Sequence, residues 1–335
     1  MKKLLIGIFM IGLFSNLSFA QVVPVGIIPL GPAGGNGTYP IGACVNPNTN
    51  RIYVANAGSN NVSVINGSTD SIINTINVAE GPYEITVNPS TNMIYIAHSN
   101  NDIVSVINGA TNSVVGTIGV GGCPWDIKVN SKTNKIYVTN QDSNTVSVID
   151  GVTNSVIATV AVGANPKGID VDSNTNKIYL TSTGSVYVID GANDSVIKEI
   201  NINGGLSGVA INTVTNKAYV TDDIFGYVFV INSSTDSVVD SIKVGMWPYA
   251  LAINQKSNKI YISDRYNDSI FVINGSNDSV VVAIIDANFT SSFWGIDVNP
   301  ETNKIYRTNC QSNTISVISG STDSVIATIL AGRMP

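Results

Sequence analysis

The sequence predicts an all-β fold, a seven-bladed β-propeller made of four-stranded antiparallel blades. The first observation behind this prediction is an Ile-Tyr or Ala-Tyr pair that returns seven times, at intervals of 42, 42, 42, 40, 42 and 45 residues. The second is that each interval holds only short runs rich in Val, Ile, Thr and Tyr, with no helical period. A strand-only repeat of this length is typical of a propeller. The repeated tyrosines are Tyr53, Tyr95, Tyr137, Tyr179, Tyr219, Tyr261 and Tyr306.

The third copy shows how one repeat is built. Residues 126–130 alternate in polarity, residues 135–139 are nearly all apolar, and residues 145–149 and 155–162 give two further strands. Asn, Asp, Gly and Ser fill the breaks, which are too short for a crossover helix. Each repeat is therefore a four-stranded meander, and a closed ring would bury the two apolar faces that a single blade leaves open. A β-solenoid is the alternative, but it would need shorter coils and atypical capping repeats.

The chain divides into three parts. Residues 1–20 begin with two lysines, continue with an apolar run and end on Ser18-Phe19-Ala20, which predicts a cleaved secretory signal; an uncleaved anchor is the alternative. Residues 21–40 carry two prolines in a strand-like run, so we expect an N-terminal edge strand and linker at the seam of the ring. Residues 41–335 form the propeller. We therefore expect an exported protein, located extracellularly, at the cell surface or in the periplasm.

Composition excludes several classes of partner and cofactor. Without the two N-terminal lysines, 15 basic residues face 23 acidic ones, which argues against nucleic acid. Apolar runs after residue 20 are too short to span a membrane. Three cysteines, Cys44, Cys123 and Cys310, permit at most one disulfide, and buried structural roles are favoured. The single histidine, His98, excludes a multi-histidine metal site and bis-histidine haem ligation; we expect it at the surface, and we expect no cofactor.

The repeat carries a recognisable motif. Tyr137-Val138-Thr139-Asn140 is the tetrapeptide that names the YVTN β-propeller repeat family, and residues 219–222 nearly repeat it. The surrounding Thr-Asn-Lys-Ile-Tyr and Ser-Val-Ile-Asp-Gly segments resemble that family over essentially the whole mature chain. The resemblance implies a propeller in an exported, often cell-surface protein, including surface-layer components of archaea and bacteria. It implies no catalytic residues, because the family motif is structural.

The two ends of the predicted ring differ. One end, the uniform face, carries the first-to-second and third-to-fourth turns, whose repeated Asn and Gly suit left-handed turn positions. The other end, the variable face, carries the second-to-third turns and the links between blades. A shortened turn at residues 181–184 and a lengthened link at residues 286–293 both fall on the variable face, as do all three tryptophans. Because function usually resides in variable loops on a rigid frame, we expect the binding site there.

The inner mouth of the variable face is the predicted site. Five residues before the end of each first strand, the seven copies read Ile41, Tyr83, Trp125, Lys167, Ser207, Tyr249 and Trp294. Four aromatic residues at one level predict a stacking platform for a sugar, a flat cofactor or a peptide side chain. The alternative is that these rings wedge between adjacent blades as core. The predicted ligand-binding residues are Tyr83, Trp125, Lys167, Tyr249, Trp294, Trp247, Asp264 and Arg265.

Small and polar residues on the same strands predict a water-filled axial channel. Glu84, Asp126, Asp170 and Asp297 could together hold a hard cation such as calcium through oxygen ligands. Lys128 among them instead favours a charge-compensated channel, and we expect no metal.

These observations favour a secreted or cell-surface recognition or scaffold module, not an enzyme, that binds a glycan or a protein through the variable face. The alternative is an exported lactonase-like or lyase-like enzyme at the same mouth, with Asp222, Asp264 and Arg265 as actors. Asp223 and Arg307, on the same turns or their strands, could also serve as acid, base or anion clamp. A third hypothesis is a carrier or subunit of a periplasmic redox complex.

Overall fold

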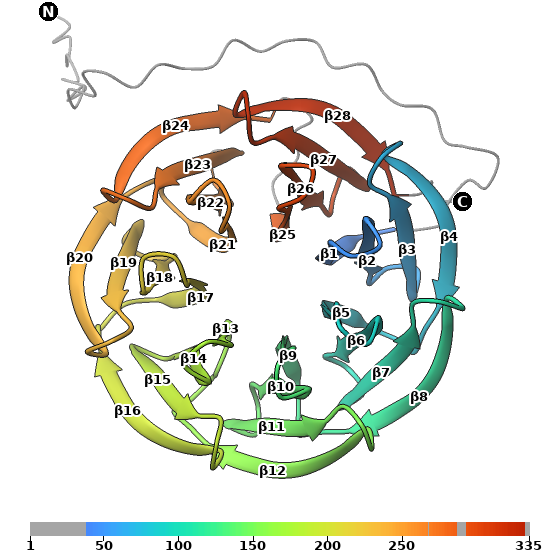
Figure 1. Cartoon of the computed structure of the whole chain (residues 1–335), viewed down its shortest axis with the longest axis horizontal. Coiled ribbons are helices and arrows are strands. Elements are labelled where there is room, and N and C mark those ends of the chain that lie inside the picture. Colours follow the sequence, from blue (N-terminus) through green and yellow to red (C-terminus); the bar gives the residue numbers. More distant parts are fainter. Residues whose placement is uncertain (1–37, 267, 287–292, 332–335) are drawn as a thin grey trace, which may run out of the picture.

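The computed structural model describes residues 38–266, 268–286 and 293–331, with side chains in the last range from residue 295 onward. Within these residues, 28 strands form seven four-stranded antiparallel sheets, and each sheet contains four consecutive strands of the chain. The sheets follow one another around a central axis as blades 1 to 7 (Figure 1). The predicted seven-bladed propeller is confirmed.

Strands at the same position in each blade share a place in the ring. The first strands lie nearest the axis (Figure 1): β1 Pro40–Asn46, β5 Pro82–Asn88, β9 Pro124–Asn130, β13 Ile169–Asp172, β17 Leu206–Asn212, β21 Pro248–Asn254 and β25 Phe293–Asn299. The second strands are β2 Arg51–Asn56, β6 Met93–His98, β10 Lys135–Asn140, β14 Lys177–Ser182, β18 Lys217–Asp222, β22 Lys259–Asp264 and β26 Lys304–Asn309. The third strands are β3 Asn61–Asn66, β7 Ile103–Asn108, β11 Thr145–Asp150, β15 Ser185–Asp190, β19 Tyr227–Asn232, β23 Ser269–Asn274 and β27 Thr314–Ser319. The outer strands are β4 Ser71–Asn77, β8 Ser113–Gly119, β12 Ser155–Ala161, β16 Ser195–Asn201, β20 Ser237–Lys243, β24 Ser279–Ile285 and β28 Ser324–Leu330.

The apolar core lies between blades. The second strands are buried almost throughout because both of their faces pack against neighbouring blades, which explains their continuous apolar runs. Outer strands such as β8 and β16 leave most residues exposed. Seven apolar clusters fill the seven junctions between adjacent blades, including the junction between blade 7 and blade 1. The ring is therefore closed.

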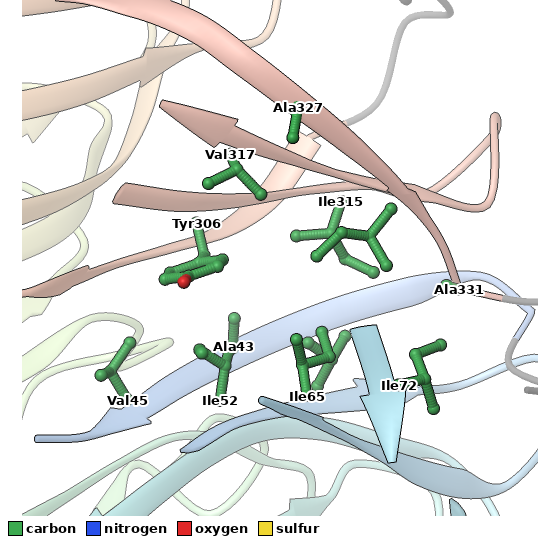
Figure 2. Packing of buried hydrophobic residues seen from close by; sticks show 12 residues of the cluster. Ala43, Val45, Ile52, Ile65, Ile72, Tyr306, Ile315, Val317, Ala327 and Ala331 are labelled. Carbon is green, nitrogen blue, oxygen red and sulfur yellow. The ribbon is translucent and has the colours of Figure 1, made fainter. Parts of the chain in front are cut away.

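Closure of the ring uses the same packing as every other junction. Figure 2 shows Tyr306, Ile315 and Val317 of blade 7 facing Ile52 and Ile65 of blade 1 across the seam. Blades 1 and 7 each take their four strands from one continuous stretch of chain. Within the described residues, the seam is therefore joined by side-chain packing and polar contacts, and not by an exchanged strand.

The polar residues of the YVTN motif hold blades together. In blade 3, the Thr139 hydroxyl donates to the carbonyl of Lys167 in blade 4 at 2.7 Å. Asn140 donates within its own blade to Thr145 and Ser147, at 3.0 and 2.9 Å. Beside the motif, a lysine at the start of the second strand forms an ion pair with an aspartate in the third-to-fourth turn of the next blade. The pairs are Lys135–Asp194, Lys177–Asp236, Lys217–Asp278, Lys259–Asp323 and Lys304–Asp70, at 2.5 to 2.7 Å. These ion pairs give the turns of the uniform face a structural role, which accounts for their repeated sequence.

The beginning of the described chain lies at the seam. The amide of Gly58 in blade 1 donates to the carbonyl of Thr38 at 3.0 Å, and the amide of Tyr39 donates to Asn313 Oδ1 of blade 7 at 2.7 Å. The predicted signal and edge strand fall almost entirely on residues 1–37, which lie outside the described residues. Across the stretches that the structure covers, no helix is long and apolar enough to cross a membrane.

Candidate functional site

A β-bulge in the first strands brings consecutive side chains to the axial mouth. In β9, the pairing with β10 shifts so that Trp125 and Asp126 together stand opposite the single residue Thr139. The same shift occurs in β5 at residues 83–84 and in β21 at residues 249–250. Two residues opposite one disrupt the strict alternation of a strand. The aromatic residue and its successor therefore line the same cavity, which the alternating pattern did not predict.

Three of the four predicted aromatic residues gather at this mouth. Tyr83, Trp125 and Tyr249 line a cavity of about 70 Å³ together with Glu84 and Asp126. The rings of Tyr83 and Trp125 lie 4.5 Å apart at 47°. Tyr83 is also part of a small apolar cluster against which Trp125 packs. The rings are thus partly wedged between blades and partly open to the cavity.

The other predicted residues are more dispersed. The guanidinium of Arg265 lies 4.6 Å above the ring of Tyr249 and so joins the mouth. Lys167 lies 3.9 Å from the Asp223 carboxylate, to which Ser207 also donates at 2.6 Å. The side chain of Trp294 falls outside the described residues. Trp247 lies on a second surface, described below, and the buried Asp264 supports it.

The mouth and the axial channel together hold four carboxylates and one ammonium, those of Glu84, Asp126, Asp170, Asp297 and Lys128. A second cavity of about 230 Å³ is lined by Asp170 and Asp297, and Lys128 lines both cavities. Burial, with Asp126 adding repulsion, raises the pKa of Glu84 to about 8. Burial also raises the pKa of Asp170 to about 6. Burial opposes the charge on Lys128, but the surrounding carboxylates outweigh it and raise the pKa of the ammonium.

Three of these carboxylates tie neighbouring blades together. Asp126 accepts the amide of Ile169 at 2.9 Å, and Asp170 accepts the amide of Ile211 at 2.8 Å. Asp297 accepts the amide of Val45 across the seam, also at 2.8 Å. No three histidine, cysteine or acidic side chains in the described part of the chain are placed to hold a metal ion. The channel carboxylates thus accept backbone amides of neighbouring blades and surround Lys128.

A second surface lies on the rim of the variable face at blades 5 and 6. Five large apolar side chains are 49 to 64% exposed there, and we call them the rim patch: Ile224, Phe225, Met246, Trp247 and Tyr266. They come from the β18–β19 turn, the β20–β21 link and the β22–β23 turn. The rings of Trp247 and Tyr266 meet edge to face, with centroids 5.4 Å apart. Beside them, a hollow of about 400 Å³ is lined by Ile224 and Trp247 together with Asp223 and Arg265.

The three segments of the rim patch lie side by side. The amide of Arg265 donates to the carbonyl of Trp247 at 2.9 Å, which joins the β22–β23 turn to the link. Gly226 of the β18–β19 turn, with φ +71°, is so close to the link that a Cβ would approach the Gly245 carbonyl to 2.3 Å. The patch is therefore one surface and not a scatter of exposed residues.

Buried carboxylates hold these loops. Asp264 accepts the amides of Met246 at 2.7 Å, Trp247 at 3.1 Å and Tyr266 at 2.8 Å. Asp222 likewise accepts the amides of Ile224 at 3.0 Å and Phe225 at 3.2 Å. Both aspartates occupy the position of the YVTN asparagine, and a carboxylate has two accepting oxygens where an amide has one. The two carboxylates that the enzyme hypothesis assigned as actors thus serve as loop caps.

Two sequence expectations are wrong. His98 is fully buried and not at the surface, because it takes the inward-facing asparagine position of blade 2, with Nδ1 3.1 Å from the Glu80 carbonyl. Burial lowers its pKa. Arg307 is fully buried between blades 6 and 7, 3.8 Å from Asp286, so it is no open anion clamp.

All three cysteines are free. Cys44 and Cys310 are buried, as expected, whereas Cys123 is half-buried.

Fold and surface together define a closed β-propeller, joined by YVTN-type contacts, that carries an apolar surface on one face. A family model of YNCE-like beta-propellers matches residues 34–301, and the chain belongs to this family. Among solved structures, the chain is similar to one titled Kuenenia stuttgartiensis Hydrazine Synthase, with 17% identity and a TM-score of 0.75 over 89% of this chain and 100% of that one. At this identity the likeness shows the fold alone. No curated protein matches the sequence.

Proposed function

We propose that this protein is a non-enzymatic recognition or scaffold module, secreted or displayed at the cell surface, that binds a protein partner through the rim patch. The main observation behind this proposal is the position of the rim-patch residues in the repeat. At the turn position of Ile224 and Tyr266, other blades carry Gly58, Asn100, Asp142 and Gln311. Contiguous exposed apolar surface is uncommon on soluble proteins unless it binds something.

The residue types favour a protein over other ligands. Trp, Tyr, Phe, Met and Arg are enriched in protein–protein interfaces, and Trp, Tyr and Arg dominate their binding energy. The rim patch supplies one Trp, one Tyr, one Phe and one Met, and Arg265 stands next to them. Backbone bonds from Asp222 and Asp264 hold the loops in place, which reduces the entropy lost on binding.

A glycan is the second candidate, and the hollow beside the patch is the observation that favours it. There the Trp247 ring stands beside the Asp223 carboxylate and the Arg265 guanidinium. A flat ring next to charged hydrogen-bonding groups suits a sugar.

The enzyme hypothesis has less support, because both oxygens of Asp264 and the Oδ1 atom of Asp222 accept loop amides. Export is supported by the signal-like residues 1–20, and a role in a surface layer is supported by the YVTN resemblance.

A photo-crosslinking amino acid tests the proposal in cells of the source organism. Placed at residue 266, it should yield a discrete cross-linked protein species. The matched control is residue 152, a valine 79% exposed in the β11–β12 turn of the uniform face. The proposal requires cross-links at 266 that are missing at 152 and that fade when Phe225 is changed to Ser. The same products at both sites, or none at 266, would refute it. Glycan cross-links confined to 266 would support the second candidate instead.

A further inference from the structure

We propose that the axial mouth binds a cationic side-chain group, the ammonium of a lysine or the guanidinium of an arginine, presented by a binding partner. The mouth combines three aromatic rings, Tyr83, Trp125 and Tyr249, with the carboxylates of Glu84 and Asp126 in one cavity. Aromatic faces attract cations, and carboxylates pair with them. This inference rests on the axial cavity and is independent of the rim patch.

The charge balance of the channel favours an added cation. Four carboxylates, Glu84, Asp126, Asp170 and Asp297, surround Lys128. At Glu84, the repulsion from Asp126 exceeds the attraction of Lys128. Burial is nevertheless the largest influence on each carboxylate and favours its neutral form. A cation at the mouth would favour the ionised form of these carboxylates, above all that of Glu84, which lines the same cavity.

One cation–π contact is already present at the mouth. The guanidinium of Arg265, carried on the β22–β23 turn, already lies over the outer ring, 4.6 Å from the centroid of Tyr249. A second cation would enter the cavity beside the paired rings of Tyr83 and Trp125 and approach Glu84 and Asp126. The β-bulges make this possible, because they place each aromatic ring and the following carboxylate in the same cavity.

The size of the cavity restricts the ligand to the end of a side chain. A buried water needs roughly 10–15 Å³ of such space, so about 70 Å³ corresponds to a few waters. That space suits an ammonium with its adjoining methylene groups. It is well below the roughly 300–1,000 Å³ of pockets that hold a whole small molecule. A sugar ring or a flat cofactor is therefore a poor fit for this cavity.

The test is calorimetric titration of the full protein with n-butylammonium chloride at constant ionic strength. We expect one site per chain, with affinity at least tenfold lower in a Glu84→Gln variant. The matched control is Glu80→Gln, which makes the same chemical change at an exposed residue of the blade 1–2 link and should bind like wild type. Sodium butyrate, with the same chain and opposite charge, should produce no binding heat.

Proton linkage gives a second readout. The groups that face Glu84 are Asp126, Lys128 and Asp297, with Tyr83, Tyr249, Cys44 and Cys310 also close enough to feel its charge. Because the pKa of Glu84 is about 8, binding at pH 7 should release a proton, and affinity should be higher at pH 9. Equal binding by wild type and Glu84→Gln, or equal binding of butylammonium and butyrate, would overturn the proposal. Neither result bears on the cross-linking at residue 266, so the two proposals can fail separately.

Discussion

Lys304 of blade 7 lies 2.7 Å from Asp70 of blade 1, and this ion pair crosses the seam where the ring closes. Tyr306 donates to the same aspartate at 3.0 Å. Equivalent pairs at other junctions, such as Lys135–Asp194, are backed by a covalent link between the blades. At the seam, within residues 38–331 as described, non-covalent contacts alone join the blades.

Asp70→Asn should therefore destabilise the protein more than the matched Asp194→Asn. Each change weakens a partly buried charged hydrogen bond, which costs about 1–3 kcal/mol. At the seam, the loss also permits local opening, because no chain connection restrains the two blades. Urea unfolding would measure stability, and amide hydrogen exchange should show faster opening of β1 and β26 in Asp70→Asn only. Uniform exchange in both variants would contradict the prediction.

A buried charge pair replaces two apolar residues at the junction of blades 6 and 7. Arg307 stands where blade 6 has Ile262, and Asp286 stands where blade 5 has Val244. Arg307→Ile alone should cost about 3–5 kcal/mol, because it leaves a buried carboxylate uncompensated. Arg307→Ile with Asp286→Val should recover most of that loss, since apolar replacements of buried ion pairs are often neutral or stabilising. A double-mutant cycle in urea measures the coupling, and additive losses would refute the prediction.

Stability should fall as the pH rises through the range in which Glu84 ionises. Its pKa is raised from 4.5 to about 8, so the folded state holds the proton more tightly than the unfolded chain. The stabilising contribution is present below about pH 4.5 and is lost as the pH approaches 8. Glu84→Gln removes this dependence, whereas Asp170, whose pKa is about 6, keeps a contribution of the same sign in both proteins.

Thermal unfolding at pH 5 and pH 9 tests this expectation. Between pH 5 and pH 9, the Tm of wild type should drop by about 3 °C more than that of Glu84→Gln. This corresponds to a loss of about 1 kcal/mol of stability, since each 1 kcal/mol shifts Tm by roughly 2–4 °C in domains of 150–250 residues. Glu80→Gln serves again as the control. Parallel curves for wild type and Glu84→Gln would show that the carboxylate ionises normally in the folded protein.

Substitutions in the rim patch should impair binding without affecting stability, whereas substitutions of the carboxylates that support it should lower stability. Trp247→Ala changes an exposed ring, so stability should move by less than about 0.5 kcal/mol while partner cross-linking from residue 266 is lost. Asp264→Ala leaves loop amides without their acceptor and should cost about 1–3 kcal/mol. Calorimetric melting with cross-linking provides both readouts. Strong destabilisation by Trp247→Ala would identify the ring as core and not as a binding residue.

The architecture was predictable because it rests on repeated local rules. The interval between tyrosines, the apolar second strands and the Asn-Gly turns all describe one blade, and the ring follows from seven copies. The prediction that the variable face carries the binding site rests on loop length and tryptophan position, and it remains a prediction.

Side-chain placement was less predictable where a residue departs from the repeat. The bulges break the alternation on which the channel prediction depended, so Trp125 and Asp126 share a cavity. Trp247 is among the predicted ligand-binding residues, but the rest of the rim patch was overlooked although its signal was present, in Ile224 and Met246 at positions that other copies fill with small or polar residues. Arg307 was expected to be accessible because arginine is rarely fully buried unless it is paired. Its partner, Asp286, lies in the preceding blade, so the sequence did not indicate the pairing.

The seam also has a consequence for chain connectivity. Thr38 and Ala331 both lie at the junction of blades 1 and 7, where Thr38 bonds to Gly58 and the amide of Ala331 donates to Asn313. An apolar cluster fills every junction, including the seam, so closure of the ring should not depend on where the polypeptide is broken. A circular permutant that joins these ends through a short glycine-rich linker and opens between blades 3 and 4 should fold to the same ring, with an unchanged circular dichroism spectrum.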